Sequence, residues 1–372
     1  MCDCHGPNAP INPFHCIVPP YMLQTLAMRA DAKTAEAARA QLVQSDEMRM
    51  GRAALSGQLM QREEQMAAPS FVAQSALAMK GAAAAGPQVK RAIYDGQGKA
   101  ALPGKLVRSE GQGPCGDAAA DKVYDYAKNV YDLYLNVFSR DSVDGRGGGL
   151  TQTVHHRKKY NNAFWDGQQM AYGDGDGQIF STFIELSVVG HEMSHGVVQY
   201  SGGLTYQGES GALNESFADV FGTIIKQHAN SETVDQADWL IGQGILGPGI
   251  NGVALRSMKA PGTAYSDALL GQDPQPYHMD FYVSTTNDNG GVHINSGIPN
   301  HAFYLYCRYL GGNAWGAPGQ VWYHALQRLN NPGASFYDWA VRTLDSATLL
   351  YGVGATEVVM LKRAWRLVGV KV

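Results

Sequence analysis

The most constraining feature of this chain is a short apolar stretch in which two histidines lie four residues apart around a glutamate. It reads His191-Glu192-Met193-Ser194-His195. On an α-helix, positions i and i+4 share one face, so the two histidines can offer imidazole nitrogens to one metal ion. Zinc is the expected ion, and Glu192 can act as general base on a water at its open position. For these residues alone, a buried helix that binds nothing is the alternative.

A second stretch supplies a third metal ligand. Nineteen residues separate His195 from Glu215, which lies where apolar residues recur at helical spacing. Asp219 is four residues further on, so it shares the helix face of Glu215 and can accept the ring N–H of His191. Two acids on a solvated helix face would be the alternative, but it requires four residue types to match by accident.

Composition sets limits on the class of protein. With 372 residues, 45% of them hydrophobic, the chain is long enough for two domains and an extension. A net charge of −4 gives no basic field for nucleic acid. No run of about 18 apolar residues is present, so no membrane partner is expected.

The N-terminal residues lack the basic and apolar regions of a signal peptide. We therefore expect synthesis in the cytoplasm without a signal peptide, with release or secretion by a non-classical route as an alternative. Cys115 and Cys307 could pair, or remain as two mostly buried thiols. Metal binding by the N-terminal cluster is a weaker alternative, because its spacing fits no four-ligand zinc pattern well; the cluster comprises Cys2, Cys4, His5, His15 and Cys16.

The remaining chain alternates recognisable segments. Residues 1–20 favour an extended segment, 21–66 a helix and 67–90 a low-complexity linker. Strand and turn patterns over 91–113 precede a helix over 121–138. Further strands are expected at 150–155, 161–165 and 169–172, and helices at 299–310, 320–329, 335–344 and 356–368.

Taken together, the motifs resemble the thermolysin-like zinc metallopeptidases from about Arg91 to the C-terminus, and the short N-terminal region resembles their protealysin-type subgroup. The resemblance rests on the stretches 161–165, 191–195, 203–206, 214–219, 255–258 and 288–297, in the family's order. It implies an α+β fold with two lobes. Residues 1–90 would be a propeptide, 91–203 a β-rich lobe that includes the HExxH helix, and 204–372 an α-helical lobe.

The resemblance also implies roles for single residues. His191, His195 and Glu215 would bind zinc, and Glu192 would activate the attacking water. Tyr206 and His293 would donate to the oxyanion, with Asp288 orienting His293. Arg256 would hold a substrate carbonyl, while Asn162 and the backbone of Ala163 would anchor the peptide as an added strand. A pocket for a bulky apolar residue after the scissile bond would be lined by Phe180, Phe183, Val188, Ile241 and Leu255.

The N-terminal region is expected to inhibit the enzyme. Pro19-Pro20-Tyr21 resembles a motif of protealysin-like precursors, and a rigid extended segment loses little entropy on lying in a cleft. Arg91 to Asp95 resembles the family's mature start, so removal is expected within about residues 67–92. The expected partners are thus protein or peptide substrates and the chain's own propeptide.

The resemblance further implies that the family's double calcium site is lost. Its carboxylate positions hold Ser187, Lys226, Leu240 and Gln243, and only Asp238 remains an acid. One carboxylate cannot hold two divalent ions that each want six to eight oxygens. Lys226 could instead supply an internal cation that pairs with Asp238.

Two other functions remain open at this point. A zinc aminopeptidase also uses HExxH with a downstream glutamate, but usually with 18 intervening residues and a GAMEN-like segment, which this chain lacks. A non-enzymatic binding protein could keep the fold. The presence of Glu192, Tyr206 and His293 argues against it.

Overall fold

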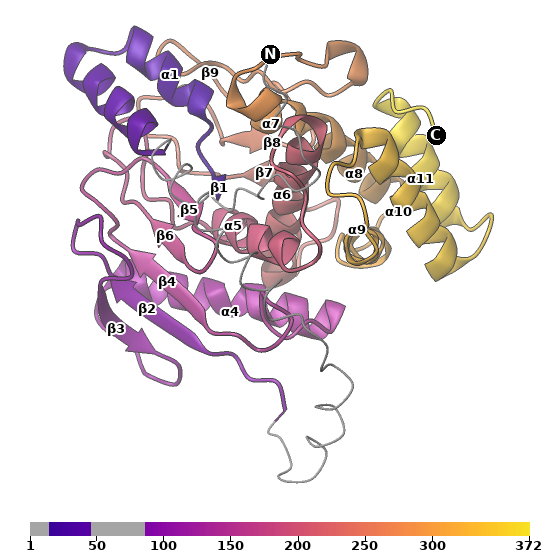
Figure 1. The fold of residues 1–372 in the computed structure, drawn as a ribbon, viewed down its shortest axis with the longest axis horizontal. Helices are drawn as coiled ribbons and strands as arrows, with labels where there is room; N and C mark the ends of the chain where they lie inside the picture. The colour runs from indigo at the N-terminus through magenta and orange to yellow at the C-terminus, as the bar shows by residue number, and fades with distance from the viewer. Residues whose placement is uncertain (1–14, 46–85) are drawn as a thin grey trace, which may run out of the picture.

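The structure is a computed structural model that describes residues 15–45 and 86–372. A sheet-containing part and a helical part lie on either side of two central helices, α5 and α6 (Figure 1). The predicted α+β class is therefore confirmed. The expected helix over 46–66, most of the linker, and the side chains of Cys2, Cys4, His5 and His15 lie outside the described residues.

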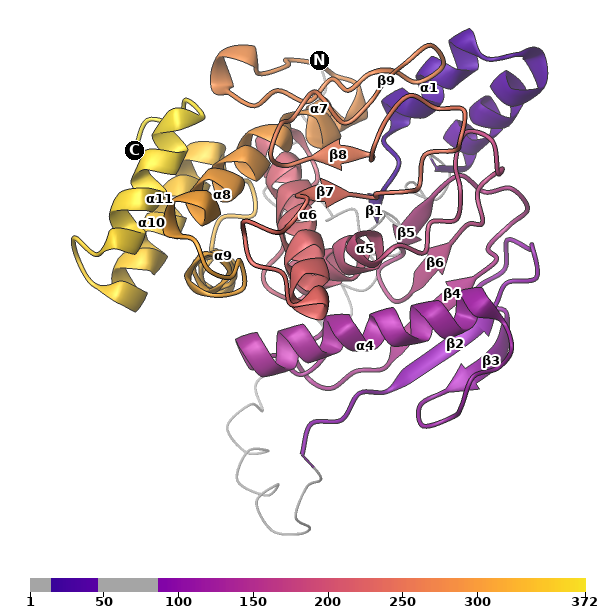
Figure 2. The same cartoon turned by 180° about the vertical axis from the view of Figure 1, so that it is seen from behind.

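The main sheet has six strands in the order β1-β5-β6-β4-β2-β3. β2 pairs in parallel with β4, and β4 with β6, while the other pairs are antiparallel. The strands are β1 (His15–Cys16), β2 (Arg91–Asp95), β3 (Lys105–Ser109), β4 (Leu150–Val154), β5 (Ala163–Trp165) and β6 (Met170–Tyr172). α4 (Ala118–Phe138) packs along this sheet (Figure 2), and Asp117 caps it by accepting from the backbone N–H groups of Ala119 and Ala120.

The two central helices approach each other closely. They are α5 (Leu186–Gln199) and α6 (Gly208–Asn230), and nearly all of their residues are buried. A Cβ atom at Gly222 would lie 2.5 Å from the carbonyl oxygen of Ser187, and one at Gly190 would lie 3.1 Å from the Cα of Gly222. Only glycine fits at these two positions, and the close crossing brings the HExxH face of α5 against α6.

The C-terminal part is mainly helical, as expected. Trp322 and Trp365 stack in its core with ring centroids 5.9 Å apart. The helices are α7 (Asp288–Asn295), α8 (Gly297–Leu310), α9 (Ala317–Gln327), α10 (Phe336–Tyr351) and α11 (Thr356–Leu367). Short strands and a 3₁₀ turn precede them: β7 (Leu240–Ile241), β8 (Arg256–Ser257), β9 (Ser266–Asp267), β10 (Gly271–Gln272) and η1 (Met279–Phe281). Within the described ranges, no helix combines the length and apolar character needed to cross a membrane.

The N-terminal helix differs from its prediction. Instead of one helix from residue 21, the chain forms α1 (Pro20–Arg29) and a second helical stretch over residues 32–45. Ala30 is extended, and Asp31 Oδ1 accepts from the backbone N–H groups of Lys33 and Thr34. An aspartate that caps a new helix is a recognised start signal, which the composition-based reading missed.

Cys115 and Cys307, which the sequence left as either a disulfide or two free thiols, do not form a disulfide. Cys307 is buried, as expected, but Cys115 is exposed. Cys115 lies in the turn before α4, where its backbone N–H donates to Asp121. Its exposure corrects the expectation of two mostly buried thiols.

A histidine clamp ties the N-terminus of α4 to the loop after β6. His155 Nδ1 lies 2.8 Å from Asp174 Oδ1, and His155 Nε2 lies 2.9 Å from Asp117 Oδ2. Both ring nitrogens therefore face carboxylates, which favours the doubly protonated ring. Burial alone would lower the pKa of His155, but Asp174 and Asp117 raise it above the ordinary value.

This clamp predicts a pH-dependent stability. A histidine whose pKa is raised in the folded state stabilises the folded protein. This contribution is fully present at pH values below the pKa of the unfolded state, and it is lost as the pH rises through the pKa of the folded state. In a Glu192→Gln background, which the sequence predicts to be inactive, His155→Gln should lower the free energy of unfolding by about 1 kcal/mol near pH 6 and by much less near pH 9. Denaturant unfolding at both pH values measures the difference, and an equal loss at both would contradict the clamp.

Candidate active site

Three predicted ligands converge between α5 and α6. Suitable ligand atoms of His191, His195 and Glu215 lie within 4.8 Å of one another, and all three side chains are buried. The Nε2 atoms of the two histidines are 3.0 Å apart, and Glu215 carboxylate oxygens lie 3.5 Å from each of them. Among the residues that the structure describes, this is the one such group of histidine, cysteine or acidic side chains.

Neighbouring polar groups turn both histidines toward this centre. His191 Nδ1 lies 2.7 Å from Asp219 Oδ1, and His195 Nδ1 lies 2.9 Å from Asn214 Oδ1. These contacts leave Nε2 of each ring as the atom that faces a metal, and they fix the tautomer. Asp219 was predicted from its spacing. Asn214 was not, although it immediately precedes Glu215.

The centre fits a catalytic zinc ion. Two imidazole nitrogens and one carboxylate form a ligand set that leaves a fourth position open. Glu215 Oε2 and Glu192 Oε1 are buried oxygens without a hydrogen-bond partner. Because buried carboxylate oxygens are normally satisfied, two such unpartnered oxygens on interacting side chains favour a cation between them.

Asp219 lies at the centre of a wider buried network. Arg256 donates to it through Nε and Nη2, each at 2.8 Å, and Asn300 Nδ2 donates at 2.9 Å. Burial alone would raise the pKa of Asp219, but the charges of Arg256 and His191 hold it well below the ordinary value. Sequence reasoning placed Arg256 against substrate only and did not find Asn300.

Glu192 lies beside the ligands, with its carboxylate positioned from the sheet. Its Oε2 accepts from the backbone N–H of Trp165 in β5 at 2.9 Å. Burial raises the pKa of Glu192 well above the ordinary value, and the charge of Glu215 adds to the rise. A carboxyl group with a raised pKa is suited to take up a proton.

The two predicted oxyanion donors also lie at the centre. The hydroxyl of Tyr206 donates to Glu215 and is 3.3 Å from His293 Nε2. His293 Nδ1 lies 2.7 Å from Asp288 Oδ1, and the backbone N–H of His293 donates to the other oxygen of the same carboxylate. Burial alone would lower the pKa of His293, but the charges of Asp288 and Glu215 raise it.

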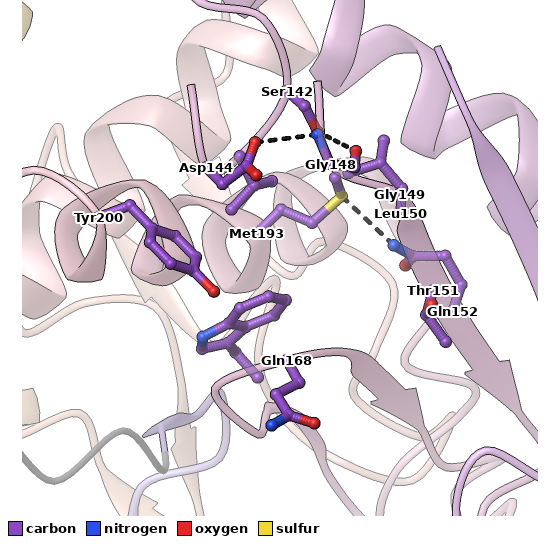
Figure 3. A pocket seen from close by; sticks show the side chains of 12 residues that line it. Ser142, Asp144, Gly148, Gly149, Leu150, Thr151, Gln152, Gln168, Met193 and Tyr200 are labelled. Carbon is purple, nitrogen blue, oxygen red and sulfur yellow. Dashed lines mark hydrogen bonds between the residues drawn. The ribbon is translucent and has the colours of Figure 1, made fainter. Parts of the chain in front are cut away.

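The predicted apolar pocket residues are all buried and belong to the main hydrophobic cluster. The rings of Phe180 and Phe183 are 5.7 Å apart. Trp165 and Met193 also line a small cavity of about 70 Å³. Gln152 Nε2 donates to Met193 Sδ there (Figure 3).

The N-terminal segment contacts this site through the residues that directly precede the predicted motif. Pro19, Pro20 and Tyr21 were the expected cleft residues, but Pro19 is the N-cap of α1 and Pro20 is its first residue. The backbone of Cys16, Ile17 and Val18 instead makes the hydrogen bonds with the site, to His293, Arg256 and Asn162 respectively. Tyr21 is partly buried nearby with its hydroxyl oxygen out of solvent, and desolvation, Tyr265 and Asp273 raise its pKa well above the ordinary value.

Lys226 and Asp238 form the expected pair. Lys226 Nζ lies 2.7 Å from Asp238 Oδ2 and 3.2 Å from Gln243 Oε1. The lysine side chain is 11% exposed and the aspartate 30%. The pair is thus largely, though not wholly, removed from solvent.

Family models and individual relatives of this chain describe metallopeptidases. Residues 79–199 match the model described as thermolysin metallopeptidase, catalytic domain, and residues 202–370 match its alpha-helical domain. The chain is 50% identical over 287 residues to the "Extracellular metalloprotease" of Pectobacterium carotovorum subsp. carotovorum, covering 77% of this chain and 82% of that protein. It is 42% identical over 290 residues to the "Thermolysin" of Alicyclobacillus acidocaldarius subsp. acidocaldarius, covering 74% of this chain and about half of that protein.

A solved structure is similar over nearly the whole chain. The precursor of protealysin, a metalloproteinase from Serratia proteamaculans, superposes with a TM-score of 0.82 at 42% sequence identity. The match covers 96% of this chain and 99% of that one.

The expected localisation is corrected by these relatives. The sequence pointed to a protein synthesised in the cytoplasm without a signal peptide, yet the 50% identical relative carries the name "Extracellular metalloprotease". The expectation of a cytoplasmic protein was therefore wrong.

Proposed function

Since this chain belongs to the thermolysin metallopeptidase family and is a peptide-bond hydrolase, we propose that it is a zinc-dependent endopeptidase made as a self-inhibited precursor. The observation that carries the proposal is the buried group of His191, His195 and Glu215 beside the unpartnered oxygen of Glu192. By analogy with its named relative, the enzyme would act outside the cell.

His191, His195 and Glu215 would hold the zinc ion. When bound, zinc supplies a Lewis acid that polarises a carbonyl and lowers the pKa of water. Glu192 would take a proton from the attacking water. Tyr206 and His293 would donate to the oxygen that becomes negative, and Asp288 would keep His293 oriented and charged. Asp219 would fix the ring of His191.

Substrate would lie along β5. Asn162 and the backbone of Ala163 would pair with the peptide as an added strand, and Arg256 would hold one carbonyl. Burial of the five apolar pocket residues supports a preference for a bulky apolar side chain after the scissile bond. The division into a propeptide of residues 1–90 and lobes of 91–203 and 204–372 remains part of this proposal.

The role of Glu192 can be tested by one substitution. Glu192→Gln keeps the side-chain size and the hydrogen bond from Trp165 but removes the base, so turnover should fall by about 10²–10⁴ or more while zinc content stays near normal. The assay is cleavage of a peptide blocked at both ends, with and without o-phenanthroline. Comparable activity in the variant would refute the assignment. Failure to cut blocked peptides would favour an aminopeptidase or a binding protein.

Self-inhibition predicts a change on processing. The segment that fills the site must leave before a substrate can enter, so activity should appear only as the N-terminal region is lost. N-terminal sequencing of active enzyme should give a start within about residues 67–92. Full activity of an uncut precursor would refute self-inhibition.

The paired lysine predicts independence from calcium. Lys226 would place its charge where a calcium ion would otherwise lie, so the midpoint of thermal unfolding should not shift between millimolar calcium and a calcium-selective chelator that leaves zinc bound. A rise of many degrees with calcium would contradict this.

The same pair predicts a stability loss. Lys226→Met leaves Asp238 partly buried without its cation and should cost about 1–3 kcal/mol, between the ranges for exposed and buried pairs. Lys128→Met is a matched control, because Lys128 pairs with Asp132 at the surface with 47% and 33% exposure. Denaturant unfolding should show a loss of about 0–0.5 kcal/mol there.

A further inference from the structure

The N-terminal segment is bound in one defined direction. β1 runs antiparallel to β5, with His15 opposite Trp165 and Cys16 opposite Phe164. The backbone N–H of Ile17 continues this pairing by donating to the carbonyl oxygen of Ala163 at 3.2 Å. The segment is therefore an added edge strand of the sheet that carries Glu192's backbone partner.

Side chains fix the register of this strand. Asn162 Oδ1 accepts from the backbone N–H of Val18 at 2.9 Å, and Asn162 Nδ2 lies 3.5 Å from the Val18 carbonyl oxygen. Arg256 Nη1 donates to the carbonyl oxygen of Ile17 at 3.0 Å. Ile17 and Val18 thus occupy the contacts that the proposed function assigns to a bound peptide substrate.

The preceding carbonyl lies at the catalytic groups. His293 Nε2 is 3.1 Å from the carbonyl oxygen of Cys16. The same nitrogen is 3.3 Å from the Tyr206 hydroxyl and 3.5 Å from Glu215 Oε2. The oxygen that would become the oxyanion during hydrolysis of the Cys16–Ile17 bond is therefore already placed at the proposed oxyanion donor.

We propose that the Cys16–Ile17 peptide bond is a self-cleavage site, held in the enzyme as a substrate and distinct from the maturation site near residue 90. This inference rests on the proposed function. Water adds to the Cys16 carbonyl carbon while Glu192 accepts a proton, the bond to the Ile17 nitrogen breaks, and the proton passes to that nitrogen. The products are a Cys16 carboxylate and an Ile17 ammonium group, and no co-reactant besides water is consumed.

The burial of the Ile17 side chain supports its position directly after the proposed cleavage site. It is fully buried and belongs to the same hydrophobic cluster as Phe180, Phe183 and Val188. A branched apolar residue directly after the bond is what the proposed pocket would select. The chain would therefore carry its own preferred cleavage sequence in the position where it blocks the site.

A cut at this bond would not release the segment. Met22, Leu23 and Leu26 of α1 are buried, and Arg29 Nη1 reaches the carbonyl oxygen of Ala268 at 3.4 Å. The new Ile17 end thus stays attached through contacts beyond the bond. The Ile17 terminus should consequently appear before peptidase activity does.

The test follows the full chain with intact-mass and terminal-peptide mass spectrometry during maturation. A fragment that begins at Ile17, and its partner that ends at Cys16, should form in the native sequence and be absent in Glu192→Gln. Ile17→Pro removes the N–H that Ala163 accepts, so the cut should disappear. Val43→Asp is the control, because Val43 is 57% exposed in the same N-terminal region, and the cut should persist.

Two further measurements keep the test decisive. A blocked peptide of residues 11–21, incubated with enzyme matured from the full chain, should be cut between Cys16 and Ile17 even if Ile17→Pro fails to fold. Hydrogen exchange in the Glu192→Gln chain should show slow exchange at Ile17 and Val18, which requires no turnover.

Active enzyme that forms while the Cys16–Ile17 bond stays intact, in both chain and peptide, would overturn the inference and leave the proposed function standing. Rapid exchange at Ile17 and Val18 would also overturn it. Loss of all cleavage of blocked peptides would instead refute the proposed function.

Discussion

The carboxylate of Asp219 is the interaction on which the rest of the site depends. It is fully buried and receives hydrogen bonds from His191, Arg256 and Asn300. These partners come from α5, β8 and α8, so one side chain on α6 sets the relative positions of three elements. Removing one partner of a buried charge costs about 3–5 kcal/mol, because the remaining charge is left without compensation.

The same network connects peptide binding to the metal centre. Arg256 uses two nitrogens on Asp219 and the third on the carbonyl oxygen of Ile17. The Ile17 carbonyl group is thus joined to the ring of His191 through only two groups, Arg256 and Asp219. The planar, five-donor guanidinium makes this possible, since a lysine could not serve both partners in a fixed geometry.

The sequence predicted the site residues that share a face of one helix, and it missed the contacts that join separate helices and strands. HExxH, Glu215 and Asp219 could be found because helical spacing defines a shared face. Asn300 and the backbone N–H of Trp165 lie 81 and 27 residues from the side chains they contact, and no periodicity reports such pairs. The cleft segment was placed at Pro19 to Tyr21 because that motif resembles one of protealysin-like precursors and is rigid. The actual register is set by Asn162 and Arg256, which belong to other parts of the fold.

The charges of the centre indicate why a divalent cation suits it. Two groups can balance the acids around it, the guanidinium of Arg256 and the imidazole of His293 in its protonated form. Four carboxylates face them, those of Glu192, Glu215, Asp219 and Asp288, and all are buried. Two negative charges therefore remain, and burying them uncompensated would cost several kcal/mol each.

Burial and the charge of Glu215 together raise the pKa of Glu192, so one of these charges is disfavoured there. An ion with two positive charges would complete the balance and allow Glu192 to ionise. Elsewhere in the chain a lysine balances a single acid, since Lys226 supplies a fixed charge to Asp238. A lysine such as Lys226 is sufficient where a positive charge is needed only to balance a partly buried acid. The catalytic centre needs a cation that leaves a position open for water, which no side chain can provide.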